Sequence, residues 1–288
     1  MSDRILGKIG VGSWTFPWAT GTVQDQRPTT ILTPVDVVQR TIDIGVHVVH
    51  FLDNLPLDSF DNQMLDQARD LARQHNIEVE VGTRGTEPEH LRKYLSIAQR
   101  MGARLLRTMG GWHKAPAPVD QIKANFREVL PEFADAGVRI ALENYEAYST
   151  SDIAAIVRAI GNAHLGVCLD LTNSFAAMES ADEILENLAP FTISVHLKEF
   201  TVERLEYLMG FAFRGKPTGQ GVLPLTKIFE TLLANSRKAN VIVEQWPPFH
   251  ENLEKTMEME FEWARQGVEH LAAMGYLVGP EKFSGNSL

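Results

Sequence analysis

The sequence predicts a single (β/α)₈ barrel, an α/β fold in which eight parallel strands alternate with eight helices. Short β-branched or alternating apolar runs recur along the 288 residues, and each is followed by a longer segment with helical apolar spacing. Eight such units follow one another without a linker-like stretch, which favours one domain over residues 1–288. No G-x-G-x-x-G motif follows the first strand, so a dinucleotide-binding doubly wound sheet is not indicated.

The predicted strands and helices alternate strictly along the chain. The strands are expected at residues 9–16, 46–53, 77–84, 103–109, 138–145, 165–172, 192–200 and 240–246. The helices are expected at residues 35–44, 61–74, 88–101, 119–136, 151–160, 181–188, 223–236 and 253–274. Gly45, Gly102 and Gly137 follow helices as C-cap residues, because glycine adopts the left-handed conformation without a Cβ penalty. Two long loops, residues 17–34 and 201–222, are candidate lids at the C-terminal face.

Composition restricts the partners of this chain. The formal net charge of −10 argues against a surface that binds nucleic acid or anionic membrane, so a small molecule is the expected partner. The single cysteine, Cys168, excludes an intramolecular disulfide and fits a reducing compartment. The N-terminus has no signal-peptide core and no apolar run is long enough to span a membrane, which favours a cytoplasmic protein.

Four consecutive predicted strands, the fifth to the eighth, end in a residue that can bind a metal ion. These residues are Glu143, Asp170, His196 and Glu244. Alternation along a strand directs each of them into the barrel together with the residue two positions before it, namely Ala141, Cys168, Ser194 and Ile242. Each one alone is explained equally well as a hydrogen-bonded strand end. Three carboxylates and an imidazole at equivalent positions instead predict a site for Mn²⁺ or Mg²⁺, with Co²⁺ also possible.

The motifs around these residues resemble those of the xylose isomerase-like TIM-barrel superfamily, in particular its sugar (phosphate) isomerase and epimerase branch. They are A-L-E-N, C-L-D-L-T-N, S-V-H-L-K-E, V-I-V-E-Q-W and G-Q-G-V-L-P-L, and the resemblance covers essentially the whole chain. It implies one divalent metal, Glu143 and Glu244 as the proton-transfer pair, and often a homo-oligomer. The chain departs from the branch at Asn173, where ketose epimerases often carry histidine, and at Gln220 of the G-Q-G motif.

Cationic and aromatic residues at other strand ends indicate the kind of substrate. Arg84, Arg107, His113, Lys198, Arg214 and Lys216 form a possible ring of positive charge that suits a carboxylate or a phosphate. Alternatively, Arg84 and Arg107 pair with inward acids such as Glu80 or with the metal ligands themselves. Trp14 and Trp246 are expected to form apolar walls, and Asn173 is expected to hydrogen-bond the substrate. His47 and His50 lie within the second strand and are interpreted as structural.

These observations favour a metal-dependent isomerase or epimerase of a sugar, sugar phosphate or sugar acid. Such an enzyme removes a proton next to a carbonyl and stabilises the enediolate that forms. The alternative is a metal-dependent lyase, a decarboxylase or dehydratase of an oxo sugar acid, with Lys198 near the developing charge. An abasic-site endonuclease on the same fold is disfavoured by the acidic charge, and a catalytically silent sugar-binding protein by the presence of both glutamates.

Overall fold

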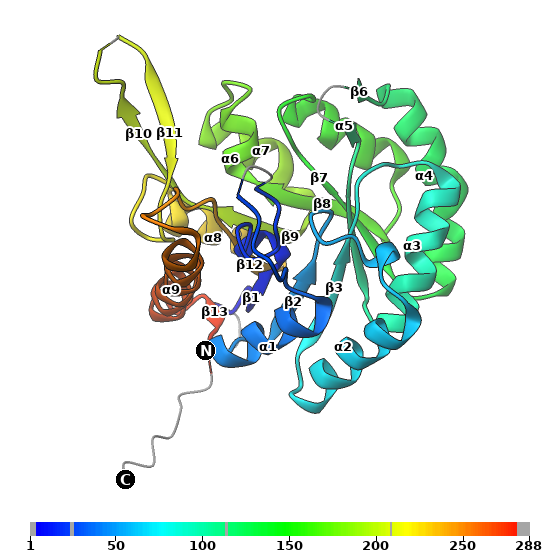
Figure 1. Cartoon of the computed structure of the whole chain (residues 1–288). Coiled ribbons are helices and arrows are strands. Elements are labelled where there is room, and N and C mark those ends of the chain that lie inside the picture. The colour runs from blue at the N-terminus through cyan, green and yellow to red at the C-terminus, as the bar shows by residue number, and fades with distance from the viewer. Residues whose placement is uncertain (1–3, 24–25, 113–114, 208, 281–288) are drawn as a thin grey trace.

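A computed structural model describes residues 4–23, 26–112, 115–207 and 209–280. Within these ranges, eight parallel strands close into a barrel, because the last strand pairs with the first, and helices surround it (Figure 1). In barrel order the strands are β1 Gly7–Gly12, β2 Val48–Phe51, β3 Glu78–Gly82, β4 Leu105–Met109, β7 Arg139–Glu143, β8 Leu165–Asp170, β9 Thr192–Lys198 and β12 Asn240–Glu244. The predicted (β/α)₈ fold is confirmed.

The helices follow the strands as the apolar spacing predicts. They are α1 Pro34–Ile44, α2 Asn62–Gln74, α3 Pro88–Met101, α4 Val119–Asp135, α5 Thr150–Ile160, α6 Leu171–Phe175, α7 Ala181–Leu188, α8 Leu225–Ala234 and α9 Leu253–Ala273. Helix α1 begins with a capping box, in which the Thr33 side chain accepts from the Asp36 backbone N–H and Pro34 occupies the first turn. It ends at Gly45, whose φ of 82° is left-handed as predicted.

Several short elements depart from the simple alternation. The first strand ends at Gly12 rather than at residue 16, because Ser13–Thr15 form a 3₁₀ turn. Two more such turns lie at Leu57–Ser59 and Ala189–Phe191. The second predicted loop contains an antiparallel hairpin, β10 Phe200–Arg204 and β11 Phe211–Gly215, that projects from the barrel (Figure 1).

Three smaller strands complete the described elements. β5 Gly111–Trp112 pairs with β6 Ala115–Pro116, and β13 Leu277–Val278 extends the sheet beside β1. No helix of the described residues is long and apolar enough to cross a membrane.

The strand register brings the polar strand ends to one level of the barrel. Asp170 of β8 pairs with His196 of β9, and Lys198 of β9 pairs with Glu244 of β12. Most of the core lies between the strands and the helices, whereas Ala141, Cys168 and Leu105 form a small separate cluster inside the barrel. Because Ala141 and Cys168 are small, the bulky polar side chains above them can converge.

Candidate metal centre and substrate pocket

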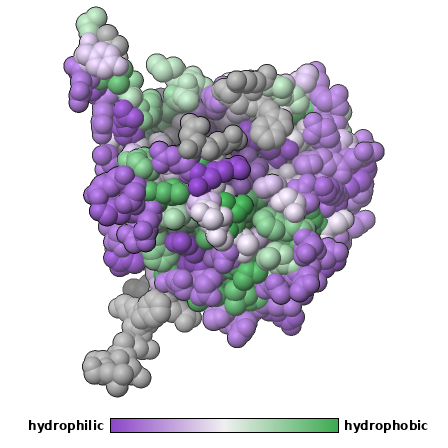
Figure 2. Space-filling view, in the orientation of Figure 1, coloured by the Kyte–Doolittle hydropathy of each residue, from purple (hydrophilic) through white to green (hydrophobic). Residues whose placement is uncertain are grey.

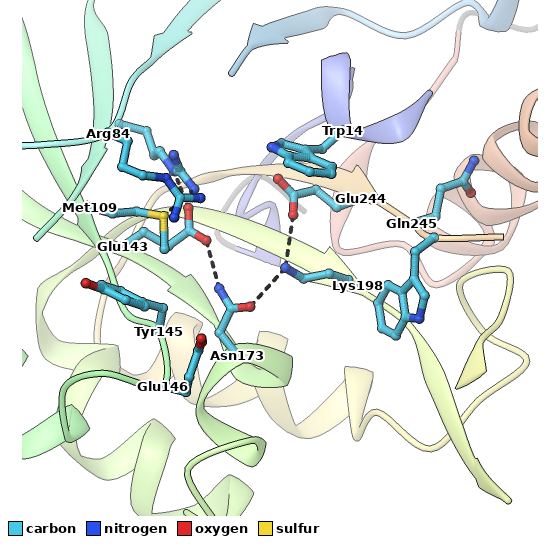
Figure 3. Close-up of a pocket in the computed structure, with 12 residues that line it drawn as sticks. Trp14, Arg84, Met109, Glu143, Tyr145, Glu146, Asn173, Lys198, Glu244 and Gln245 are labelled. Atoms are coloured by element: carbon cyan, nitrogen blue, oxygen red, sulfur yellow. Dashed lines mark hydrogen bonds and ion pairs between the residues drawn. The ribbon is translucent and has the colours of Figure 1, made fainter. Parts of the chain in front are cut away.

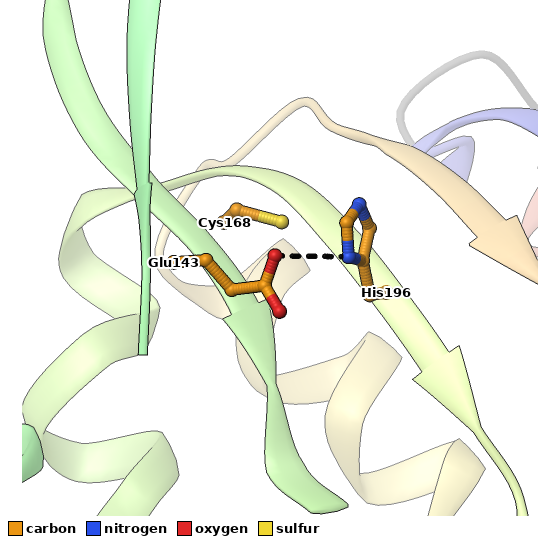
Figure 4. A group of neighbouring side chains, drawn as sticks. All are labelled: Glu143, Cys168 and His196. Atoms are coloured by element: carbon orange, nitrogen blue, oxygen red, sulfur yellow. Dashed lines mark ion pairs between the residues drawn. The ribbon is translucent and has the colours of Figure 1, made fainter. Parts of the chain in front are cut away.

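The four predicted metal ligands converge at the C-terminal end of the barrel. Two groups of buried donor atoms share His196, one with Glu143 and Cys168 and the other with Asp170 and Glu244. Within each group the donor atoms lie within 4.8 Å of one another. His196 Nδ1 lies 3.2 Å from Glu143 Oε2, as Figure 4 shows, and 3.0 Å from Glu244 Oε1. The strand ends thus place three carboxylates around one imidazole nitrogen.

The donor atoms fit a divalent cation. His196 Nδ1, Asp170 Oδ2 and Glu244 Oε1 are buried and have no well-directed hydrogen bond among the described residues. These atoms lie in ion-pair contact, His196 Nδ1 with Glu244 Oε1 and Asp170 Oδ2 with Lys198 Nζ, so a cation at this point would be surrounded by buried anionic donors. Three carboxylates and a histidine suit a hard or borderline divalent metal.

The charged groups of the candidate centre shift one another's pKa values. Burial would raise the pKa of Glu143, but Arg107 and His196 hold it well below its usual range. Burial also opposes ionisation of Glu244, yet His196 and Lys198 lower its pKa to about 2. Burial would lower the pKa of His196, but neighbouring anionic groups raise it well above its usual value. Because a metal binds the neutral imidazole, this rise in the pKa of His196 opposes metal binding.

Cys168 is the one donor in these groups that is unsuited to the ligand role. Its thiol is fully buried, and burial raises its pKa to about 11. A metal binds the thiolate form, which this environment disfavours. The ligand set that fits a divalent metal is therefore the predicted one of Glu143, Asp170, His196 and Glu244, with Cys168 packed beneath it as the sequence suggests.

A second buried histidine lies against the far side of the ligand histidine. His50 Nδ1 of β2 is 3.3 Å from His196 Nε2 and 3.5 Å from Glu80 Oε2 of β3. Glu80 in turn accepts from Asn240 Nδ2 at 2.8 Å. Such a contact fixes the ring orientation of a metal-binding histidine, and here it would leave Nδ1 of His196 to face a bound metal. His50, interpreted from the sequence as structural, is thus a neighbour of the candidate metal centre.

Lys198 and Asn173 connect the two sides of the centre. Lys198 Nζ lies 2.9 Å from Asp170 Oδ2 and 3.3 Å from Glu244 Oε2, and it donates to Asn173 Oδ1 at 3.0 Å. Asn173 Nδ2 donates to Glu143 Oε1 at 2.9 Å (Figure 3). Although burial opposes the charge of Lys198, Asp170 and Glu244 raise its pKa, so the amine is an ammonium.

The arginines at the ends of β3 and β4 pair with carboxylates, the alternative that the sequence left open. Arg107 is buried, and its guanidinium contacts Glu143 and lies 3.0 Å from Asp53 Oδ1. Arg84 Nη2 lies 3.0 Å from Asp53 Oδ2. Their partners are Glu143 and Asp53, while Glu80 contacts His50. The positive charge of Arg107 is thereby held next to a metal ligand.

A cavity of about 310 Å³ opens above the metal centre, a size suited to a small molecule. It is lined by Trp14, Arg84, Arg107, Met109, Glu143, Tyr145, Glu146, Asn173, Lys198, Glu244, Gln245 and Trp246, most of which Figure 3 labels. Of the residues expected to bind substrate, Trp14, Arg84, Arg107, Asn173 and Trp246 line it. Arg214 instead is exposed on β11 near Glu203, and His113 lies outside the described residues.

Two residues of this region escaped the sequence analysis. Tyr145 lines the cavity, and its buried ring packs edge-to-face against that of Tyr148. Its position two residues after Glu143, on the same face of the extended chain, is the signal that could have revealed it. Glu199 is buried behind Lys198, where its carboxylate accepts from the backbone N–H groups of Gly219 and Leu223. It anchors the G-Q-G loop rather than the substrate.

The comparisons with known proteins agree with this geometry. The family model for the xylose isomerase-like TIM barrel matches residues 38–273. The chain belongs to this family. Among curated proteins, the 3-oxo-isoapionate decarboxylase of Pectobacterium atrosepticum is 32% identical over 263 residues, which cover 91% of this chain and 94% of the relative.

Solved structures of this family share the fold at low sequence identity. A D-psicose 3-epimerase, solved in the presence of D-fructose, has a TM-score of 0.71 and 11% identity over 94% of this chain and 100% of its own. A xylose isomerase-like protein from Mycobacterium smegmatis, in complex with magnesium, has a TM-score of 0.65 and 14% identity over 90% and 97% of the two chains. Likenesses at this identity establish the barrel alone. In this xylose isomerase-like barrel the buried donor groups form a candidate divalent-metal site.

Proposed function

We propose that this chain is a divalent-metal-dependent lyase that decarboxylates a 3-oxo sugar acid. The observation that carries the proposal is the protonation pattern of the site. Both glutamates are held as carboxylates of lowered pKa, and Lys198 is held as an ammonium between Asp170 and Glu244. The lowered carboxyl pKa values make both glutamates weak bases, whereas the Lys198 ammonium beside them carries a transferable proton. The decarboxylase among the relatives supports the same choice.

Decarboxylation of a 3-oxo acid fits that pattern because it needs no base. The bond between the carboxylate carbon and C2 breaks, CO₂ leaves, and the electron pair moves from C2 toward the oxo oxygen. One proton then adds to C2, so each turnover consumes one proton and releases one CO₂. A divalent metal, held by Glu143, Asp170, His196 and Glu244, would supply Lewis acidity at the oxo group. Mn²⁺ or Mg²⁺ fits this donor set, and Co²⁺ is compatible with it.

The residues of this chain take distinct parts in the proposed reaction. Lys198 Nζ holds the proton that is delivered to C2, and Asn173 orients Lys198 through its 3.0 Å contact. Asn173, where ketose epimerases often carry histidine, thus connects Lys198 to Glu143. Arg84 and Tyr145 line the same cavity, and the Arg84 guanidinium offers donors to the carboxylate before it leaves. Trp14 and Trp246 supply apolar walls for the carbon chain.

An isomerase or epimerase is the second candidate, because Glu143 and Glu244 both line the cavity and could act as an acid and base pair. It requires one glutamate to accept a proton from carbon. Arg107 beside Glu143, and His196 and Lys198 beside Glu244, oppose that step by lowering the pKa of each carboxyl.

The two candidates differ in their products. Metal-free protein is supplied with Mn²⁺ and a panel of 3-oxo sugar acids in D₂O, and the products are analysed by mass spectrometry and CO₂ detection. The lyase releases one CO₂ and gives a product with one deuterium at the former C2. Deuterium incorporation with all carbons retained, on either an acid or a neutral ketose, would reject the lyase and establish the isomerase.

A further inference from the structure

Asp53, which follows β2, contacts three side chains that line the cavity. Its Oδ2 accepts from Arg84 Nε at 3.1 Å and lies 3.0 Å from Arg84 Nη2. Its Oδ1 lies 3.0 Å from Arg107 Nη1 and 3.5 Å from Trp14 Nε1. Trp14 lies in the turn after β1, Arg84 follows β3, and Arg107 belongs to β4. One carboxylate thus connects the ends of four neighbouring barrel strands.

The chain on both sides of Asp53 is held by hydrogen bonds to one buried serine. The backbone N–H of Leu52 donates to Ser13 Oγ at 2.9 Å, and Asn54 Nδ2 donates to the Ser13 carbonyl at 3.1 Å. Leu52 and Ser13 are fully buried. Because its neighbours are fixed in this way, the short Asp53 side chain is a rigid support against which the longer Arg84 side chain is oriented.

The two arginines that Asp53 contacts differ in how they face the cavity. Arg107 is buried and bonded within the protein, because its Nε contacts Glu143 and its Nη1 donates to the Thr83 carbonyl at 3.0 Å as well as to Asp53. Arg84 binds Asp53 through the edge that carries Nε and Nη2, and it lies beside Glu143 at the cavity wall (Figure 3). Arg84 is therefore well placed to receive the acid group of a ligand.

Asp53 also sets the net charge of the site. The cations are Arg84, Arg107 and Lys198, and the carboxylates that contact them are Asp53, Glu143, Asp170 and Glu244. These groups give a net charge of −1, which a divalent metal on neutral His196 would change to +1. Glu146, which also lines the cavity, is exposed, so water screens its charge. One carboxylate neutralises such a site, whereas a dianion leaves a buried negative charge without compensation.

The surface of the molecule does not favour an anionic ligand. The chain carries a formal net charge of −10, and hydrophilic residues cover most of the face that Figure 2 shows. Surface charges are screened beyond about 10 Å at 0.1 M salt, so the choice between a monoanion and a dianion rests on the groups of the site itself. Without the charge of Asp53, the metal-loaded site would carry +2 and would accommodate a dianion.

We infer that Asp53 is a positioning residue through which the metal-loaded site selects a carboxylate over a dianionic acid group such as a phosphate. It orients Arg84 toward the acid group and removes one unit of positive charge from that end of the cavity. The substrate contacts Arg84, and Asp53 acts through it. The inference rests on the proposed function only in taking this acid group to be the carboxylate of the substrate.

Two probes of equal shape test the inference by calorimetry on the Mn²⁺-loaded protein. They are 3-hydroxypropanoate, a monoanion, and 2-hydroxyethylphosphonate, measured above its second pKa as a dianion; neither has an oxo group, so neither can be decarboxylated. Asp53→Asn should raise the ratio of phosphonate to carboxylate affinity about 10–100-fold, because the dianion gains twice as much from the lost negative charge. Asp53→Glu keeps the charge and should keep the wild-type ratio. Asp66→Asn removes the same charge from a pair with Arg100 outside the barrel and should also leave the ratio unchanged.

The wild type gives a second measurement that does not depend on the folding of any variant. Free Mn²⁺ binds the phosphonate more tightly because of its higher charge, whereas the loaded wild type should bind the carboxylate more tightly. A wild type that prefers the phosphonate, an unchanged ratio in Asp53→Asn, or an equal rise in Asp53→Glu or Asp66→Asn would overturn the inference. CO₂ release with an unchanged ratio would reject this inference alone, and a shifted ratio in a protein that releases no CO₂ from 3-oxo acids would reject only the lyase.

Discussion

Arg107→Met removes the cation that the fold places between the buried carboxylate of Glu143 and the partly buried carboxylate of Asp53. Arg107 contacts Glu143 and lies 3.0 Å from Asp53 Oδ1, and it also donates to the Thr83 carbonyl at 3.0 Å. Breaking a buried ion pair by removing one partner costs about 3–5 kcal/mol, because the remaining charge is buried without compensation. With an m-value of about 2–3 kcal/mol per molar urea, the unfolding midpoint should fall by roughly 1–2 M.

The matched control for this variant is Arg100→Met. Arg100 also contacts a carboxylate, Asp66 at 2.9 Å, but it is partly exposed on the outside of the barrel. Exposed pairs contribute about 0–1 kcal/mol, so this change should move the midpoint little. Both variants are unfolded in urea with a chelator present and monitored by circular dichroism.

Metal binding adds a second readout to the same experiment. A bound cation would compensate the charge of Glu143 that Arg107 leaves behind, so Mn²⁺ should stabilise Arg107→Met more than it stabilises the wild type. Ligand binding at 100 times its Kd contributes about 2.7 kcal/mol to the free energy of unfolding, which is easily measured. Equal losses in Arg107→Met and Arg100→Met, with equal gains from Mn²⁺, would refute the coupling of Arg107 to the metal ligands.

Three further predictions follow from the site and its surroundings. His50→Leu should weaken Mn²⁺ binding, measured by calorimetry, about 10–100-fold, because the His196 ring loses the contact that orients it. The control His47→Leu, on the same chain segment, should bind Mn²⁺ as the wild type does, and equal affinities of the two variants would contradict this role for His50. Lys198→Met should retain Mn²⁺ binding but lower the rate of CO₂ release by about 10²–10⁴, and an unchanged rate would exclude Lys198 as the proton donor. Glu260 is buried in α9, and burial raises its pKa to about 8 although it accepts from the backbone N–H groups of Trp18 and Ala19. Above pH 4.5, the ordinary pKa of a glutamate, Glu260 is ionised in the unfolded chain but keeps its proton in the folded state. The stability of the wild type should therefore fall relative to that of Glu260→Gln as pH rises from 5.5 to 8, by up to about 1.4 kcal/mol per pH unit. Urea midpoints of the two proteins that run parallel across this range would contradict the prediction.

Much of the barrel could be predicted because its signals are local. Apolar spacing and helix-ending glycines such as Gly45 located the strands and helices, and the fold then brought the ends of the last four large strands together. Strand alternation was enough to place Glu143 and His196 on the inward face. These features depend on the spacing of apolar residues within each segment and on the number of alternating strand and helix segments, and both can be read from a sequence.

The remaining features depend on contacts between distant segments. His50 meets His196 across the interior of the closed barrel, and the sequence cannot show which inward side chains reach one another there. The choice of Arg107 between Glu80 and Glu143 was open for the same reason. The hairpin of β10 and β11 was predicted as a loop, because segments between barrel units are normally irregular. The alternation in F-T-V-E-R and F-A-F-R-G could have indicated its two strands.

The central claim is that Glu143, Asp170, His196 and Glu244 together hold one divalent metal. Anomalous diffraction from a crystal grown with Mn²⁺, collected at the manganese absorption edge, tests it most directly. We expect a single strong anomalous peak within ligand distance, about 2.0–2.4 Å, of a donor atom from each of the four side chains. No peak at this position, or a peak bound to the Cys168 sulfur without Asp170 and Glu244, would contradict the account.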